Sequence, residues 1–154
     1  MSSRPYTSAD RSSCLALFDS NVPRYFADSE RAEFEHFLDE LPGPYLVLLD
    51  EGGTMLACGG YAIRAEDGVA DLCWGMVDGR RHAQGLGRTL TELRISMAAA
   101  DPAVGALELN TSQLTTGFYE RLGFEVTKVI PDGYGPGMDR CDMSRRVDVD
   151  GGGR

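Results

Sequence analysis

The spacing of hydrophobic residues predicts two helices near the start of the chain. The segment 7–10 carries the Thr-x-x-Asp pattern of a capping box, which begins the first helix. The second helix begins near Ser29 and ends at the helix-breaking sequence Pro42-Gly43-Pro44. Its hydrophobic residues recur at three- and four-residue intervals, as on one face of a helix. They are Phe34, Phe37, Leu38 and Leu41.

From residue 45 onward the pattern becomes that of strands joined by turns. A weak strand pattern also precedes the first helix. Three strands are predicted in succession at 45–49, 54–64 and about 69–77. Helix, strand, helix and two strands follow at 86–100, 104–110, 114–122, 125–130 and 141–147. Three consecutive strands before a β-α-β unit imply an α/β fold of the α+β kind, with a central, mostly antiparallel mixed sheet and helices on both faces.

The length and the termini predict one domain without a membrane anchor. At 154 residues the chain suits a single domain of ordinary size. We expect that domain to span residues 1–147 and the Gly-rich tail 148–154 to be disordered. The N-terminus lacks the hydrophobic stretch of a signal peptide, and no hydrophobic run is long enough to cross a membrane. A cytoplasmic location is therefore predicted.

The cysteines and the net charge exclude several kinds of ligand. The four cysteines form no C-x-x-C pair and stand apart from both histidines in the sequence. We therefore expect reduced thiols in the core and no metal site. Acidic side chains outnumber basic ones by 24 to 15, which gives a formal net charge of −9. Nucleic-acid backbones and anionic membranes repel such a chain, so neither is expected as a partner.

The most informative segment lies between Trp74 and Leu90, where a predicted strand leads through a loop into a helix that opens with Gly85-Leu86-Gly87. The first amides of a helix lack internal acceptors and carry partial positive charge, and glycines let a phosphate approach them closely. The segment 78–94 holds four arginines against two acidic residues, a local charge of +2. Together these features favour an anion site over an ordinary glycine turn beside a solvated basic helix.

The kind of anion is narrowed by what this segment lacks. It has no Gly-x-x-x-x-Gly-Lys sequence of a nucleotide-binding P-loop. A dinucleotide-binding fingerprint would need a third glycine at Leu90 and a tighter turn, although Glu108 stands about where the ribose-binding acid would. A dinucleotide-dependent oxidoreductase therefore remains as a weaker alternative.

Two motifs match those of a known family. His82-Ala83-Gln84-Gly85-Leu86-Gly87 fits the pattern Gln/Arg-x-x-Gly-x-Gly/Ala after a fourth strand, except that His82 replaces Gln or Arg. The segment 117–124, Gly-Phe-Tyr-Glu-Arg-Leu-Gly-Phe, looks like a short helix with the sequence YEKLGF, and Ser112 stands where Asn is common. In these motifs and in its order of elements, the chain resembles the GNAT N-acetyltransferase family, and in particular a bacterial subgroup. The resemblance covers nearly the whole chain.

The resemblance implies the GNAT acyl-CoA N-acyltransferase fold and acetyl-CoA as the cofactor. In that family the pyrophosphate binds backbone amides of the first motif, and the pantetheine arm pairs with the strand before it. The amide of Met76 would also polarise the thioester carbonyl. The implied cofactor-binding residues are Met76, Val77, His82, Ala83, Gln84, Gly85, Leu86, Gly87, Arg88, Ser112 and Phe118.

Transfer to an amine needs a base, because an alkylamine is almost entirely protonated at neutral pH. Asp71 and Glu108 lie in strands that otherwise look buried, and Asp71 aligns with the position where some family members hold their base. Each carboxylate could instead occupy an exposed strand position, and the choice between them stays open. Tyr119 is the candidate acid for the leaving thiolate, the alternative being a packing role between Phe118 and Phe124.

The acceptor is the least defined part of the predicted site. By resemblance, its contacts come from the segment between the first two helices and from the loop joining the last two strands. Here these segments carry Tyr25, Phe26 and Tyr134, which either line an acceptor pocket or anchor the loops. We expect direct attack on acetyl-CoA by a primary amine of a small molecule or peptide, drawn as a cation to the acidic chain. The alternative is a non-catalytic acyl-CoA-binding or regulatory domain, and a homodimer is left open.

Overall fold

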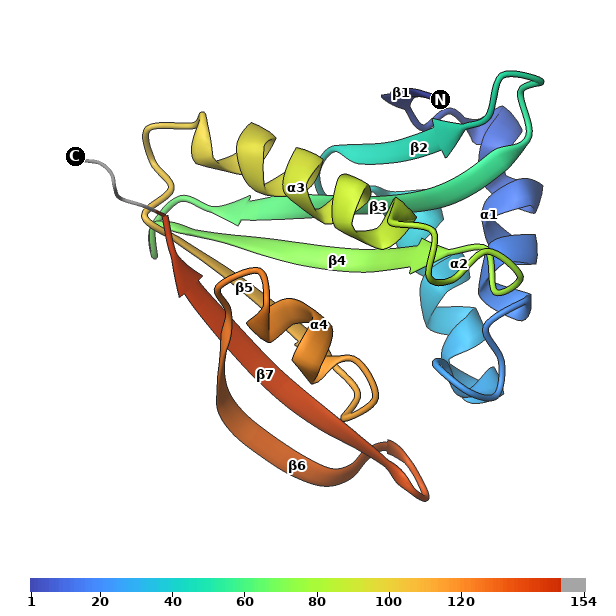
Figure 1. Cartoon of the computed structure of the whole chain (residues 1–154). Helices are drawn as coiled ribbons and strands as arrows, with labels where there is room; N and C mark the ends of the chain where they lie inside the picture. The colour runs from blue at the N-terminus through green and yellow to red at the C-terminus, as the bar shows by residue number, and fades with distance from the viewer. Residues whose placement is uncertain (148–154) are drawn as a thin grey trace. The chain divides into compact units, whose positions relative to one another are not determined.

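The computed structural model describes residues 1–147, so the predicted disorder of the tail 148–154 lies outside the described residues. Helices and strands follow in the predicted order (Figure 1). Short 3-10 helices, Ser8–Asp10 and Asp28–Glu30, lead into the first two α-helices. The elements are β1 (Ser2–Pro5), α1 (Arg11–Asp19), α2 (Arg31–Glu40), β2 (Tyr45–Leu49), β3 (Met55–Arg64), β4 (Val69–Val77), α3 (Leu86–Ala99), β5 (Ala106–Thr111), α4 (Thr116–Glu120), β6 (Glu125–Gly135) and β7 (Met138–Arg146).

The strands form a seven-stranded sheet in the order β1-β2-β3-β4-β5-β7-β6. The pair β4–β5 is parallel, whereas β1–β2, β2–β3, β5–β7 and β6–β7 are antiparallel. The predicted mixed, mostly antiparallel sheet is therefore confirmed. By compactness the chain divides into two units, 1–62 with 73–94 and 63–72 with 95 onward. Strands β3 and β4 and helix α3 contribute to both units.

In the first unit, the strands carry hydrophobic side chains on both faces, and a helical layer covers each face. One cluster joins α1 and α2 to β2 and includes Phe18, Phe34 and Val47. A second cluster joins the first turns of α3 to the strands through Leu86 and Leu90. The predicted placement of helices on both faces is thus seen within this unit (Figure 1).

The predicted capping box is present at the start of α1. The Thr7 amide donates to the Asp10 carboxylate at 2.9 Å, and Arg4 donates to the same carboxylate at 2.7 and 2.8 Å. These hydrogen bonds, that of Arg4 first, lower the pKa of Asp10 to about 2. Because Arg4 belongs to β1, the ion pair ties the first strand to the beginning of α1.

A left-handed residue interrupts β4 in the first unit. Trp74 has a φ of 46°, a conformation that is uncommon for any residue other than glycine. The Tyr45 hydroxyl donates to the Trp74 carbonyl at 2.8 Å, and the indole stacks on Phe34 at 5.0 Å between ring centroids. These contacts fix the irregularity, which sets the direction of Gly75–Val77, the end of the strand that leads into the glycine loop.

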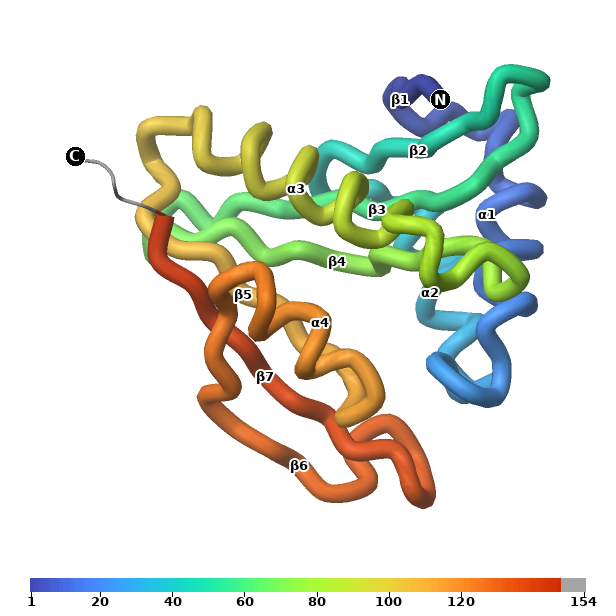
Figure 2. Tube along the Cα trace, viewed as in Figure 1, coloured from blue at the N-terminus to red at the C-terminus, as the bar shows by residue number. Residues whose placement is uncertain are grey.

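In the second unit, β6 and β7 form a hairpin, and α4 packs against β6 (Figure 2). Gly123 follows α4 with a φ of 93°, which confirms the predicted left-handed cap. Arg145 donates to the Leu122 carbonyl at 2.9 Å and satisfies one of the helix's last acceptors. The helix is thereby fixed to the strand that follows the hairpin turn.

The segment 131–137 was expected to be a loop, and that expectation is wrong because β6 continues to Gly135. The Gly137 amide donates to the Asp132 carboxylate at 2.8 Å, and the Asp132 amide donates to the Asp139 carboxylate at 3.0 Å. Gln113 holds the same hairpin, since its amide group donates to the Gly137 carbonyl at 2.9 Å and accepts from the Asp139 amide at 2.8 Å. These side chains let the Pro- and Gly-containing segment close as a hairpin.

Candidate active site

A loop between β4 and α3 presents backbone amides to solvent. Residues 82–85 are exposed, and Ala83 and Gly85 have φ angles of 71° and 78°. Left-handed residues within a turn can point successive N–H groups to one side, which forms a hollow for an anion. A Cβ placed on Gly85 would meet no atom within 4 Å, so the space beside it is open.

The beginning of α3 supplies further donors beside this hollow. The Thr89 amide donates to the Gly85 carbonyl at 3.1 Å and closes the first turn of the helix. The amides of Leu86, Gly87 and Arg88 stand before that bond and have no acceptor within the helix. They carry the partial positive charge of a helix N-terminus. The loop and the helix start therefore offer exposed N–H donors and partial positive charge, the features that an anion such as a pyrophosphate needs.

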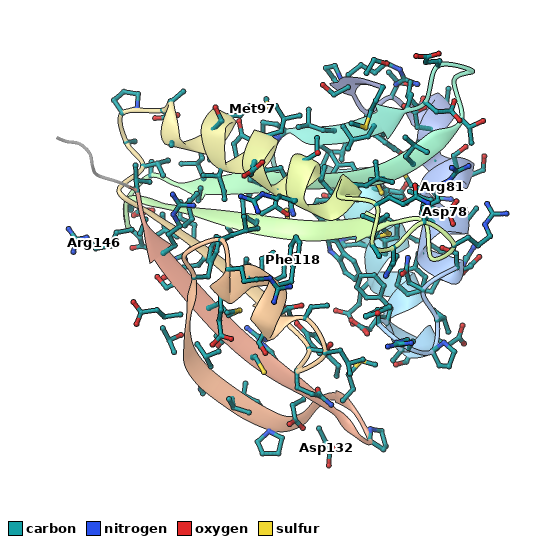
Figure 3. The ribbon with its side chains drawn as sticks, viewed as in Figure 1. Asp78, Arg81, Met97, Phe118, Asp132 and Arg146 are labelled. Atoms are coloured by element: carbon teal, nitrogen blue, oxygen red, sulfur yellow. The ribbon has the colours of Figure 1, made fainter. Side chains whose placement is uncertain are left out.

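The carboxylate of Asp78 anchors the loop and is almost fully buried. Arg80 donates to it from the side chain at 3.0 and 3.2 Å and from the backbone amide at 3.0 Å. These bonds lower the pKa of Asp78, with the Arg80 side chain as the largest cause. The Arg81 guanidinium lies 3.5 Å from the Asp78 carboxylate. Figure 3 labels Asp78 and Arg81 at the end of β4 that leads into the loop. The sequence pattern gave Asp78 only as a charge, although an Asp two residues before a pair of arginines in a loop was the available signal.

The predicted acceptor segment is joined to this loop within the first unit. Asn21 donates to the carbonyls of Leu17 and Val77, both at 2.8 Å. The Gly79 amide donates to the Ser20 hydroxyl at 2.9 Å. A Cβ on Gly79 would lie 2.1 Å from the Ser20 carbonyl oxygen, so no other residue fits without a backbone shift. The segment after α1 and the glycine loop are therefore one connected structure.

The two aromatic residues of the acceptor segment occupy different places. The Tyr25 ring lies 4.8 Å from the His82 ring, which places it at the glycine loop. The Phe26 ring stacks on Phe18 at 5.0 Å and lies 5.9 Å from Trp74, within the aromatic cluster under α1 and α2. Phe26 thus anchors the segment, while Tyr25 is presented beside a predicted cofactor-binding residue.

The expectation that four arginines gather at the anion site is wrong for one of them. Arg88 pairs with Glu92 at 3.0 Å on the exposed side of α3. Arg94, in contrast, is only 2% exposed and its guanidinium lies inside the first unit. It sits one helical turn beyond Leu90, on the helix face that packs against the strands. Its charge is therefore unavailable to a phosphate in the loop.

In the second unit, Arg64 brings the two candidate bases together. Its guanidinium donates to Asp71 at 2.7 and 3.1 Å and to Glu108 at 2.8 Å. Asp67 is a third partner of the same guanidinium, at 2.5 Å. Asp71 and Glu108 face each other across the parallel pair β4–β5, where they are register partners. Sequence reasoning missed Arg64, because only the strand register shows that it lies beside both carboxylates.

The argument that these carboxylates are buried and unpaired is wrong. Their side chains are 38% and 45% exposed, for Asp71 and Glu108 respectively, and both are paired with Arg64. They lie on the face of the strands opposite to the buried Leu107 and Leu109, as the alternation of a strand requires. Access to solvent is compatible with proton transfer through water, so their catalytic role stays a prediction.

The remaining predicted residues lie around α4 in the second unit. The Tyr119 ring makes edge-to-face contacts with Phe118 at 5.0 Å and Phe124 at 5.9 Å between centroids. Figure 3 shows Phe118 on α4. Ser112 is buried, and its hydroxyl accepts from the Leu114 amide at 3.3 Å. The Tyr134 hydroxyl donates to the Asn110 side chain, which fixes the hairpin to the end of β5.

Comparisons with known proteins identify the family. A family model described as an acetyltransferase (GNAT) domain matches residues 20–146. No curated protein matches the sequence. The structure is similar to that of ribosomal-protein-S18-alanine N-acetyltransferase from Escherichia coli, with a TM-score of 0.77 and 19% identity over 99% of this chain and 97% of that one. It is also similar to an aminoglycoside 6'-N-acetyltransferase complexed with coenzyme A, with a TM-score of 0.77 and 14% identity over 97% and 98%. Ard1 from Thermoplasma volcanium gives a TM-score of 0.79 and 18% identity over 96% and 98%.

The chain belongs to the GNAT acetyltransferase family, because the family model covers most of it. It is accordingly an acetyl-CoA-dependent N-acetyltransferase, and the solved structures show that it shares their fold. Within residues 1–147, no helix is both long and hydrophobic enough to span a bilayer.

Proposed function

We propose that this enzyme acetylates a primary amine of a small molecule or peptide by direct attack of the amine on acetyl-CoA. The observation that carries the proposal is the exposed loop with two left-handed residues that opens α3. In the proposal, the amides of residues 82–87 hold the pyrophosphate and Arg88 contributes positive charge.

The end of β4 is proposed to hold the pantetheine arm. Met76 is buried, and Val77 follows it at the entrance to the loop. The Val77 carbonyl already accepts from Asn21 at 2.8 Å, and a His82 ring nitrogen lies 3.3 Å from it. Because a carbonyl oxygen accepts two hydrogen bonds, a cofactor amide would replace His82 there. His82 would then be free to turn toward the phosphates.

We infer that Asp71 is the base, acting through water on the acceptor ammonium, with Glu108 as the alternative. Both are solvent-accessible, and Arg64 holds each of them in place. Removing the ammonium proton frees the lone pair that attacks the thioester carbonyl. Tyr119 is proposed to give its hydroxyl proton to the leaving sulfur of coenzyme A. The second proton that the nitrogen would shed as the amide forms would restore the Tyr119 hydroxyl through water.

Asp71→Asn is expected to lower kcat/KM about 10- to 100-fold at neutral pH, because an amide cannot accept the proton. The loss should shrink as the pH approaches the pKa of the acceptor, where the amine loses its proton unaided. Asp67→Asn is the matched control, since it also removes a carboxylate from Arg64. An equal loss in that control would show that only the arginine network matters. A loss of kcat/KM in Glu108→Gln but not in Asp71→Asn would assign the role of base to Glu108.

The acceptor is proposed to be cationic and to contact Tyr25, which lies beside the glycine loop. The formal charge of −9 favours encounter with a cation. The solved neighbours are named for an aminoglycoside and for an alanine of a ribosomal protein, which supports an amine of either class. Membership of the acetyltransferase family favours catalysis over the non-catalytic acyl-CoA-binding role that the sequence left open.

Release of free coenzyme A separates these two functions. The enzyme is mixed with acetyl-CoA and, in turn, with polyamines, aminoglycosides, amino acids and peptides with a free N-terminus. We expect amine-dependent release for at least one cationic class, together with the acetylated product by mass spectrometry. Tight binding of acetyl-CoA without release for any amine would favour the non-catalytic role. Release with neutral or anionic amines alone would contradict the charge argument.

A further inference from the structure

A buried arginine in α3 has no acidic partner among the residues that the structure describes. Arg94 is 2% exposed, and none of the ion pairs among residues 1–147 includes it. Its guanidinium donates to the Gly60 carbonyl at 3.3 Å and to the Thr91 hydroxyl at 3.4 Å, both long contacts. Its Nε atom has no hydrogen-bond partner among the described residues. The five N–H groups of the side chain are therefore weakly satisfied.

Two glycines make the space for this guanidinium. A Cβ on Gly75 would lie 2.5 to 2.9 Å from three guanidinium atoms of Arg94. A Cβ on Gly59 would lie 3.3 Å from the guanidinium carbon and 3.0 Å from the Gly75 Cα. The charged group therefore rests directly on the backbone of β3 and β4. It lies beside Gly75, the residue whose carbonyl group forms the peptide bond with Met76.

This arrangement is costly and unlike the other buried charges of the described chain. Burying a charge without a partner carries a large desolvation penalty. Asp10 and Asp78 are also buried, but each is paired with an arginine. Glu30 accepts a hydrogen bond from the Ala27 amide at 2.8 Å. Arg94 alone among these four keeps an uncompensated charge, and a leucine or methionine at this position would pack without that cost.

We infer that Arg94 is a positioning residue for acetyl transfer, which acts through the Gly75–Met76 peptide unit. The inference rests on the proposed function and on the expectation, implied by the family resemblance, that the Met76 amide polarises the thioester carbonyl. A positive charge beside Gly75 would strengthen that polarisation and favour negative charge on the thioester oxygen. The amine lone pair would form the C–N bond while the carbonyl π electrons move to oxygen. They would return as the C–S bond breaks with its electron pair on sulfur, and the nitrogen would lose its extra proton to water. The unpaired charge therefore stabilises the oxyanion, with no proton moved by Arg94 itself.

The proposed role explains why Arg94 has no carboxylate partner within residues 1–147. An acidic neighbour would cancel the electric field of the guanidinium at the backbone. Gly59 and Gly75, which have no side chains, let the guanidinium approach the backbone closely. The field acts in a water-poor interior, where electrostatic interactions are less screened than at the surface. The effect should appear in the transition state more strongly than in binding of coenzyme A, which has no acetyl carbonyl.

The test replaces Arg94 with methionine, which removes the charge and keeps much of the volume. Three quantities are measured: the Kd of coenzyme A by calorimetry, kcat, and the carbonyl stretch of bound 13C-labelled acetyl-CoA by infrared difference spectroscopy. We expect kcat to fall about 10- to 100-fold, as for loss of an oxyanion-stabilising group. The Kd should change less than about threefold, and the carbonyl stretch should move toward that of free acetyl-CoA. Arg94→Lys, which keeps a charge, should retain part of the shift.

Arg11→Met is the matched control, because it removes one positive charge from an exposed surface pair with Asp39. An unchanged carbonyl stretch in an Arg94→Met protein that binds coenzyme A normally would overturn the inference. If Arg94→Met does not fold, Arg94→Gln and Gly75→Ala replace it in the same measurements. A carbonyl stretch that moves toward that of free acetyl-CoA supports the inference, and an unchanged stretch overturns it. The alanine Cβ would displace the guanidinium, so the shift should again be lost. Failure of the unmodified enzyme to bind acetyl-CoA would instead overturn the proposed function.

Discussion

Replacing Gly85 with valine is expected to weaken acetyl-CoA binding by about 100-fold or more. The φ of Gly85 is 78°, a conformation that a β-branched residue adopts only with strain. The added side chain would also fill the open space beside the amides that are proposed to hold the pyrophosphate. Loss of two charge-assisted hydrogen bonds, each worth about 1.5 to 3 kcal/mol, accounts for an effect of this size.

Gly53→Val is the matched control for this prediction. Gly53 has a φ of 87° and, like Gly85, open space around its missing Cβ, but it lies in the β2–β3 turn. Both valines should lower the free energy of unfolding by a similar amount, about 1 to 2 kcal/mol, as left-handed conformations cost ordinary residues. Only Gly85→Val should change the calorimetric Kd of acetyl-CoA. Equal affinities for the two variants would show that the loop does not hold the cofactor.

Replacing Tyr119 with phenylalanine is expected to lower kcat about 100-fold, because general acid catalysis contributes on this scale. The substitution removes only the hydroxyl, so the edge-to-face contacts with Phe118 and Phe124 should persist. The melting temperature and the Kd of acetyl-CoA should therefore stay close to those of the unmodified enzyme. Initial rates of coenzyme A release across a pH series provide the measurement.

Stability and binding distinguish an acid from a packing residue. If Tyr119 protonates the leaving thiolate, Tyr119→Phe should lose kcat while the melting temperature and the Kd of acetyl-CoA stay unchanged. Tyr6→Phe is a suitable control, since Tyr6 lies edge-to-face with Tyr45 in the first unit. Unchanged turnover in Tyr119→Phe would remove the acid assignment and leave the tyrosine with the packing role.

The elements of this fold could be predicted from local sequence because their signals are local. The capping box at Thr7–Asp10, the left-handed cap at Gly123 and the glycine helix start each depend on a few neighbouring residues. The hydrophobic stripe of α2 shows the limit of that approach. Leu41 continues the stripe in sequence, yet the helix ends at Glu40 and Leu41 adopts a φ of 42° with its side chain exposed. The Pro-Gly-Pro sequence after it prevented another turn.

The candidate site was predictable only where its residues adjoin one another in sequence. The glycine loop was found because strand, loop and helix start are consecutive. The grouping of Arg64 with Asp71 and Glu108 needs the register of β4 with β5, which no local pattern contains. Arg94 was placed with the loop arginines by proximity in sequence, although its spacing from Leu90 put it on the buried face. The net charge of residues 78–94 does not show the direction in which each arginine side chain points.

The most direct test of the central claim is a titration of 15N-labelled enzyme with acetyl-CoA, followed by amide resonances. The account predicts saturable shifts that are largest for residues 82–88, together with Met76 and Val77, and reduced by Gly85→Val. Gly53 and its neighbours in the β2–β3 turn should remain unshifted. Binding that leaves the amides of residues 82–88 unchanged, or no binding at millimolar acetyl-CoA, would contradict the assignment of the glycine loop as the cofactor site.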